Sequence, residues 1–176
     1  MGIIDPHLHI WTQNPKYPWA KETTNPPRTE ASVEMLMDLM KENGVQRSVL
    51  VQYIGYRWDN SYVADTFKRF PKLFQGVSRV NPADPASPDH LSQLAGQGFR
   101  GVRLSPGVDA SGDWIRGPLM PPLWKRAEQL KQPMVILTGI TRMPDVGALI
   151  EHHPDLTVVI DHMGDCPAIN RRSWKN

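Results

Sequence analysis

Short apolar runs alternate with longer segments of helical periodicity along the chain. The runs are rich in β-branched residues, which predicts strands over residues 2–9, 47–52, 73–80, 99–104, 134–138 and 156–161. Between them, apolar residues recur every three to four positions. This predicts helices from residue 33 to a stop at Gly44, from residue 63 to a stop at Pro71, from a start at Ser87-Pro88, and over 119–131 and 141–152.

The order of these elements predicts an α/β fold with a parallel sheet covered by helices. The strands are near-continuous apolar runs, as expected where both faces of a sheet are buried. A doubly wound sheet and a (β/α)8 barrel both satisfy this pattern. No glycine-rich phosphate loop follows the first strand, which argues against the nucleotide-binding version of the fold.

Composition favours one soluble domain over residues 1–176, because 40% of the residues are hydrophobic and 22% are charged. The formal net charge of +2 includes +3 from Arg171, Arg172 and Lys175, so residues 1–170 carry −1 and we expect no nucleic-acid partner. The single cysteine, Cys166, excludes an intramolecular disulfide and is expected to be a bystander. Strand-like residues begin at position 2 and no apolar run approaches about 18 residues. We therefore expect no signal peptide, no membrane span and a cytoplasmic location.

Polar residues gather where the predicted strands end, and in a barrel these ends meet at one mouth. They are His7, His9, Gln52, Tyr53, Arg79, Asn81, Arg103, Ser105, Thr138 and His162. Residues 12–28, rich in proline and tryptophan, would form the first loop over that mouth. Trp11, Trp19 and Trp58 are expected to serve either packing or substrate contact.

His7 and His9 are the strongest candidates for chemistry. Alternate side chains of a strand share a face, so both histidines would reach one metal ion or one polarised carbonyl, which predicts hydrolysis. A third histidine, His162, follows the last predicted strand. The structural alternative is that His7 and His9 only form hydrogen bonds at a strand end. Arg103 is a candidate for substrate binding, because its guanidinium offers a bidentate fork for a carboxylate or carbonyl. The alternative role for Arg103 is that of a surface or ion-pair arginine. Gln52 is a second candidate for substrate binding.

Three motifs in order resemble the amidohydrolase-related (amidohydrolase 2) family, closest to its sugar-lactone and 2-pyrone-4,6-dicarboxylate lactonase branch. They are Ile4-Asp5-Pro6-His7-Leu8-His9-Ile10-Trp11, Gly101-Val102-Arg103-Leu104 and Val158-Val159-Ile160-Asp161-His162-Met163-Gly164. The resemblance covers residues 3 to about 168. It implies a distorted (β/α)8 TIM-type barrel that hydrolyses esters, lactones or amides at the carboxyl ends of its strands.

By this resemblance His7 and His9 match the first-strand pair and His162 the sixth-strand histidine. In the family these hold a divalent metal or, in the lactonase branch, polarise the substrate carbonyl without one. Arg103 matches a substrate-binding arginine. The usual fourth-strand lysine and fifth-strand histidine have no counterpart, so we expect one divalent metal such as zinc, bound by His7, His9 and His162, or none.

The resemblance also implies that the chain is C-terminally incomplete, with about six of the eight βα units. The family's eighth-strand aspartate, which activates water, has no counterpart. Asp161 is expected to face away from His162 and so not to replace it. We therefore expect a lactone hydrolase with a small-molecule carbonyl substrate, weak activity in this chain alone, and self-association through exposed strand edges. The alternatives are an inactive truncated fragment and a metal-dependent decarboxylase of the same superfamily.

Overall fold

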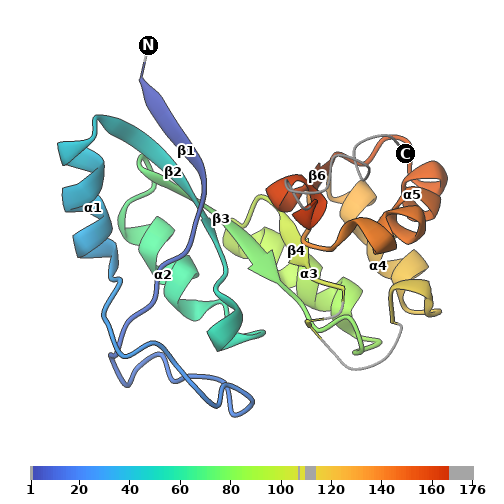
Figure 1. Cartoon of the computed structure of the whole chain (residues 1–176), viewed down its shortest axis with the longest axis horizontal. Coiled ribbons are helices and arrows are strands. Elements are labelled where there is room, and N and C mark those ends of the chain that lie inside the picture. The colour runs from blue at the N-terminus through green and yellow to red at the C-terminus, as the bar shows by residue number, and fades with distance from the viewer. Residues whose placement is uncertain (1, 107, 110–113, 167–176) are drawn as a thin grey trace. The chain divides into compact units, whose positions relative to one another are not determined.

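The computed structural model describes residues 2–106, 108–109 and 114–166. Strands and helices alternate along these residues as the sequence predicts (Figure 1). The elements are β1 (Ile3–Leu8), α1 (Val33–Glu42), β2 (Val45–Val51), α2 (Ser61–Arg69), β3 (Phe74–Arg79), α3 (Ser87–Gln97), β4 (Val102–Leu104), α4 (Met120–Gln129), β5 (Met134–Ile136), α5 (Met143–His152) and β6 (Val158–Ile160). The basic stretch over 170–176 lies outside the described residues.

Three strands are much shorter than predicted. β4, β5 and β6 have 3 residues each, whereas the apolar runs around them cover 99–104, 134–138 and 156–161. Phe99 and Leu156 are both buried, but they lie in the turns that lead into the strands. The Phe99 ring packs edge-on against Phe67 of α2, with 5.0 Å between the ring centroids. An apolar run therefore predicts burial here, and the strand occupies only part of it.

The chain divides into two compact units, which we describe separately. Unit 1 comprises Met1–Arg79 and Leu94–Arg100, and unit 2 comprises Val80–Gln93 and Gly101–Asn176. In unit 1, β1, β2 and β3 lie in that order and pair in parallel. Helix α1 packs on β2 and α2 packs on β3 (Figure 1).

Local sequence explains why α1 begins and ends where it does. The Ser32 hydroxyl accepts a hydrogen bond from the Met35 amide at 3.4 Å and caps the amino end. Val33 and Met40 on one face are buried in the core of unit 1. Gly44, just after the helix, has φ +68°, a left-handed conformation that glycine adopts without a steric cost. The amphipathic pattern and these two signals fix the helix between β1 and β2.

In unit 2, β4, β5 and β6 lie in that order and also pair in parallel. Arg103 on β4 lies opposite Val135 on β5, which lies opposite Val159 on β6. Trp124 of α4 is fully buried in this unit, as are Leu123 and Ile136. None of the helices in the described part of the chain is both long and apolar enough to cross a bilayer.

Candidate functional site

The end of β1 brings His7 and His9 together, as the sequence predicts. Their ring centroids are 5.1 Å apart with the rings nearly perpendicular. The pairing of β1 with β2 shifts register between Asp5 and Leu8, where Pro6 has no amide hydrogen to donate to a ladder. Within this bulge the His7 amide donates to the Asp5 carboxylate at 3.1 Å. The two rings thus meet edge to face where the strand is irregular.

A backbone carbonyl fixes the orientation of His9. Its Nδ1 lies 2.7 Å from the carbonyl oxygen of Val51, the last residue of β2. Because a carbonyl only accepts, Nδ1 carries the proton and the lone pair of neutral His9 lies on Nε2. This is the arrangement by which proteins hold a histidine that binds a metal or accepts a proton. Both histidines are partly exposed, so the pair forms part of a surface.

Gln52 directly follows β2 and is fully buried. Its side-chain amide donates to the Asp59 carbonyl at 2.5 Å, and its backbone amide donates to Val77 at 2.9 Å. The structure therefore gives Gln52 a role in holding the turn after β2. Its predicted contact with substrate stays a prediction.

Arg103 forms a buried ion pair with Asp161 in unit 2. The Arg103 Nε and the Asp161 Oδ2 are 3.2 Å apart, and the two side chains are 3% and 4% exposed. The register explains the pairing: Arg103, Val135 and Val159 share one face of the sheet, and Asp161 lies two residues beyond Val159 on the same face. The arginine side chain spans β5 to reach it, a distance of about two strand spacings, or ~10 Å.

His162 lies in η4 (Asp161–Asp165), directly after β6. His162, Met163, Gly164 and Asp165 all have positive φ, between 47° and 68°. The donor atoms of Asp161 and His162 lie within 4.8 Å of each other. The expectation that Asp161 faces away from His162 is therefore wrong. It assumed strand alternation, which holds as far as Asp161 and fails at His162, where the backbone enters a left-handed turn.

Each unit presents side chains of types that bind a divalent metal. In unit 1 the lone pair of neutral His9 lies on Nε2, and in unit 2 Asp161 and His162 present a carboxylate and an imidazole from neighbouring positions. Sequence reasoning did not name Asp161 as a donor. The signal in the sequence that could have identified it is its position beside His162, directly after the last strand.

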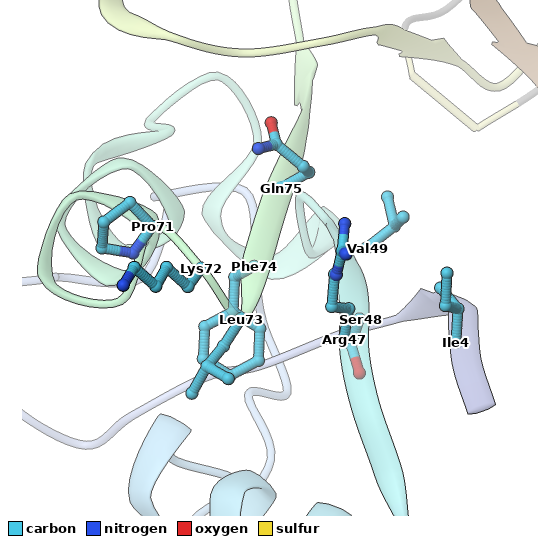
Figure 2. Close-up of a pocket in the computed structure, with 9 residues that line it drawn as sticks. All are labelled: Ile4, Arg47, Ser48, Val49, Pro71, Lys72, Leu73, Phe74 and Gln75. Carbon is cyan, nitrogen blue, oxygen red and sulfur yellow. The ribbon is translucent and has the colours of Figure 1, made fainter. Parts of the chain in front are cut away.

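Two cavities in the described residues are lined by none of the predicted site residues. One, of about 520 Å³, opens in unit 1 among Ile4 of β1, Arg47 to Val49 of β2 and the segment from Pro71 to Gln75 (Figure 2). The other, of about 400 Å³, lies in unit 2 beside His152 and His153 at the end of α5. His153 is bonded to Glu128 at 3.2 Å and His152 to the Ala148 carbonyl at 2.7 Å, as expected for structural histidines.

Comparison with known proteins identifies the class of fold. The chain superposes on a probable 2-pyrone-4,6-dicarboxylic acid hydrolase from Acinetobacter baumannii, crystallised with citric acid, with a TM-score of 0.79 and 22% identity over 93% of this chain and 59% of that one. An uncharacterised TIM-barrel protein from Bordetella bronchiseptica gives a TM-score of 0.71 and 22% identity over 90% of this chain and 66% of that one. The predicted α/β fold of the TIM-barrel type is confirmed, and the described residues contain six of its strands with alternating helices.

Sequence comparison gives the family. Residues 4–174 match the amidohydrolase family, and the chain belongs to it. An L-fucono-1,5-lactonase from Burkholderia ambifaria is 28% identical over 173 residues, which are 97% of this chain and 59% of that protein. The chain thus spans less than two thirds of the length of this relative. The predicted resemblance to amidohydrolases of the lactonase branch is confirmed.

Proposed function

We propose that this chain carries the carbonyl-activating part of a lactone hydrolase. The observation that supports this most strongly is the His7–His9 pair at the end of β1, with His9 oriented by the Val51 carbonyl. It occurs in a member of the amidohydrolase family whose relative at 28% identity is named as a sugar lactonase. The proposed substrate class is therefore a cyclic ester of a sugar acid.

The proposed reaction is addition of water to the lactone carbonyl, followed by opening of the ring ester bond. His7, His9 and His162 would polarise the carbonyl oxygen, either directly or by holding one divalent metal such as zinc. A metal, when bound, would act as a Lewis acid on that oxygen. The amidohydrolase superfamily generally uses a divalent metal, and the imidazole and carboxylate groups described above fit one.

Arg103 and Gln52 are the proposed substrate-binding residues. Arg103, beside its ion pair with Asp161, would bind an oxygen of the ring substituents through its guanidinium fork. Gln52 would act through a side chain whose amide nitrogen is already oriented by Asp59. Both residues would then bind the ring substituents and leave the carbonyl to the histidines.

The test measures lactone hydrolysis by proton release, with L-fucono-1,5-lactone as the first substrate. It compares this chain with a chimera in which the matched part of the Burkholderia L-fucono-1,5-lactonase is replaced by this chain. We expect weak hydrolysis by the chain and clear hydrolysis by the chimera, since a general base contributes roughly 10²- to 10⁴-fold. Release of CO2 from aromatic carboxylates, with no lactone opened by either protein, would favour the decarboxylase alternative. Dialysis against a chelator, followed by return of zinc, distinguishes hydrolysis with one metal from hydrolysis with none.

We also propose that the chain self-associates through its outer strands. Ile3 and Ile4 of β1 are 55% and 57% exposed, and Val159 and Ile160 of β6 are 44% and 36% exposed. Exposed apolar edge strands favour pairing with another chain. Sedimentation velocity should show a concentration-dependent dimer or larger species that Ile4→Lys weakens. A strictly monomeric chain at high concentration would contradict the proposal.

A further inference from the structure

A row of aromatic rings in unit 1 begins at the candidate histidines. The His9 and Tyr53 ring centroids are 5.8 Å apart, only slightly farther than the His7 and His9 centroids. Beyond Tyr53 the row continues to Trp11 at 4.9 Å and to Trp19 at 6.2 Å. Tyr53 follows the end of β2, and both tryptophans come from the segment after β1. The row therefore joins the two loops that border the histidine pair.

The backbone holds these rings in place. A Cβ added to Gly55 would lie 2.7 Å from Cε1 of Tyr53 and 3.1 Å from Cζ3 of Trp19, so only glycine allows this approach of the two rings. The Gly55 carbonyl accepts hydrogen bonds from the Ala20 amide at 3.0 Å and the Thr23 hydroxyl at 2.8 Å. The turn after β2 is thus fixed to the first loop at the position where Tyr53 and Trp19 meet.

Tyr53 differs from its neighbour Tyr56 in a way that indicates contact with a ligand. Tyr56 is 3% exposed, stacks on Trp19 at 4.7 Å, and its hydroxyl donates to the Thr12 carbonyl at 3.1 Å. Tyr53 is only partly buried, and among the described residues its hydroxyl has no hydrogen-bond partner. Tyr56 is therefore a core residue, whereas the Tyr53 ring presents surface beside His9.

We propose that Tyr53 is a specificity-determining residue whose ring packs against one face of a cyclic substrate while His7 and His9 act on its carbonyl. This inference rests on the proposed lactone hydrolysis and adds the feature that is recognised, the C–H face of a closed sugar ring. Aromatic faces attract such surfaces without needing a hydroxyl on the aromatic side. Open-chain sugar acids present no such face. Packing against the Tyr53 ring should therefore favour binding of the lactone over binding of its open-chain hydrolysis product.

The test uses the 176-residue chain and a ligand that cannot be hydrolysed, the 1,5-lactam of L-fuconic acid, with open-chain L-fuconate as comparison. Binding is followed by NMR titration. Tyr53→Leu should weaken lactam binding roughly three- to tenfold, the size expected for one aromatic contact, and leave fuconate binding unchanged. Tyr53→Phe keeps the ring and should bind the lactam within about twofold of the wild type. Tyr56→Phe is the matched control in the core and should also stay within that range.

A second measurement needs no variant: intermolecular NOEs from the lactam C–H protons to the Tyr53 ring protons are expected in the wild type. Absence of lactam binding, absence of these NOEs, or unchanged lactam binding by folded Tyr53→Leu would each overturn the proposal. The two proposals fail separately. If the lactam binds with these NOEs but neither the chain nor the chimera hydrolyses the lactone, the proposed hydrolase function is wrong and the proposed contact between Tyr53 and the sugar ring stands. If the lactone is hydrolysed but Tyr53→Leu binds the lactam as the wild type does, the hydrolase function stands and the role proposed for Tyr53 is wrong.

Discussion

At the end of β1, unit 1 presents two partly exposed histidines, one of them oriented by a backbone carbonyl, whereas at the ends of β4 and β6 unit 2 buries an arginine and an aspartate as an ion pair. In unit 1 the Val51 carbonyl orients His9 without placing a charge beside it. In unit 2 the charges of Arg103 and Asp161 are removed from water, and the exposed His162 follows them in a left-handed turn. Under the proposed function, the chemistry would take place at the partly exposed histidines of unit 1. Arg103 of unit 2 would serve both the stability of the fold and the binding of substrate.

The largest effect should come from breaking the ion pair of unit 2. Arg103→Met leaves the Asp161 carboxylate buried beside an apolar side chain, which should lower the free energy of unfolding by about 3–5 kcal/mol. The double variant Arg103→Met with Asp161→Leu should recover more than half of that loss. Urea unfolding followed by circular dichroism measures both. Equal stability of wild type and Arg103→Met would show that the pair is not a structural element.

A milder change separates the structural and substrate roles of Arg103. Arg103→Lys keeps a positive charge near Asp161 but loses the planar fork, so lactone binding by the chimera should weaken by about 1–3 kcal/mol. The loss of folding stability should be smaller than for Arg103→Met. If Lys and Arg give the same KM, the residue serves the fold alone.

The next effect tests the attachment of the first loop in unit 1. Tyr56→Phe removes the bonds between the Tyr56 hydroxyl and the Thr12 amide and carbonyl, at 2.9 and 3.1 Å, and should cost about 1–3 kcal/mol at pH 7. Burial raises the pKa of Tyr56 from 10.0 to about 12, although the bond to Thr12 opposes the shift. A raised folded-state pKa gives stabilisation that is complete below pH 10.0 and lost as the pH rises to about 12.

The stability difference between the wild type and Tyr56→Phe should therefore shrink as the pH rises through that range. Burial also raises the pKa of Tyr62, which both proteins share. Thermal melts of the two proteins at several pH values measure the difference. A gap that stays constant up to pH 12 would show that Tyr56 ionises as it does in the unfolded chain.

The smallest effect compares one glycine from each unit. Gly44 and Gly164 both have φ +68°, but an added Cβ meets nothing within 4 Å at Gly44, whereas at Gly164 it lies 2.8 Å from Met143 Cε. Gly44→Ala should cost about 1–2 kcal/mol from backbone conformation alone. Gly164→Ala should lower the free energy of unfolding by more than Gly44→Ala does. Adding Met143→Ala should remove the part of this extra loss that comes from the clash with the Met143 side chain. Equal losses for the two single alanine variants would mean that Met143 moves aside freely.

The sequence predicts the elements and the histidine pair because both depend on local periodicity. Alternation along one strand places His7 beside His9, and the core positions of α1 follow from spacing alone. The pairing of Arg103 with Asp161 depends on the register of three strands that are distant in sequence. Sequence alone therefore left open whether Arg103 is an ion-pair residue or a substrate ligand.

The turn after β6 was mispredicted for a different reason. Side chains alternate between faces only while the backbone stays extended. The residue types in Asp161-His162-Met163 do not predict a left-handed backbone, because in this turn only Gly164 favours that conformation. The sequence likewise predicted only part of the aromatic row. Trp11 and Trp19 were recognised near the mouth, but their approach to Tyr53 depends on the tertiary contact at Gly55.

The most direct test of the account is the turnover of L-fucono-1,5-lactone by the chimera carrying His9→Asn. The asparagine amide nitrogen replaces Nδ1 as donor to the Val51 carbonyl, so the structural bond is kept while Nε2 is removed. His152→Asn, at an exposed histidine of α5, is the matched control. We predict that kcat falls roughly 10²- to 10⁴-fold for His9→Asn, and equally for His7→Asn, and stays within about twofold for His152→Asn. A folded His9→Asn chimera with wild-type kcat would contradict the assignment of the chemistry to the end of β1.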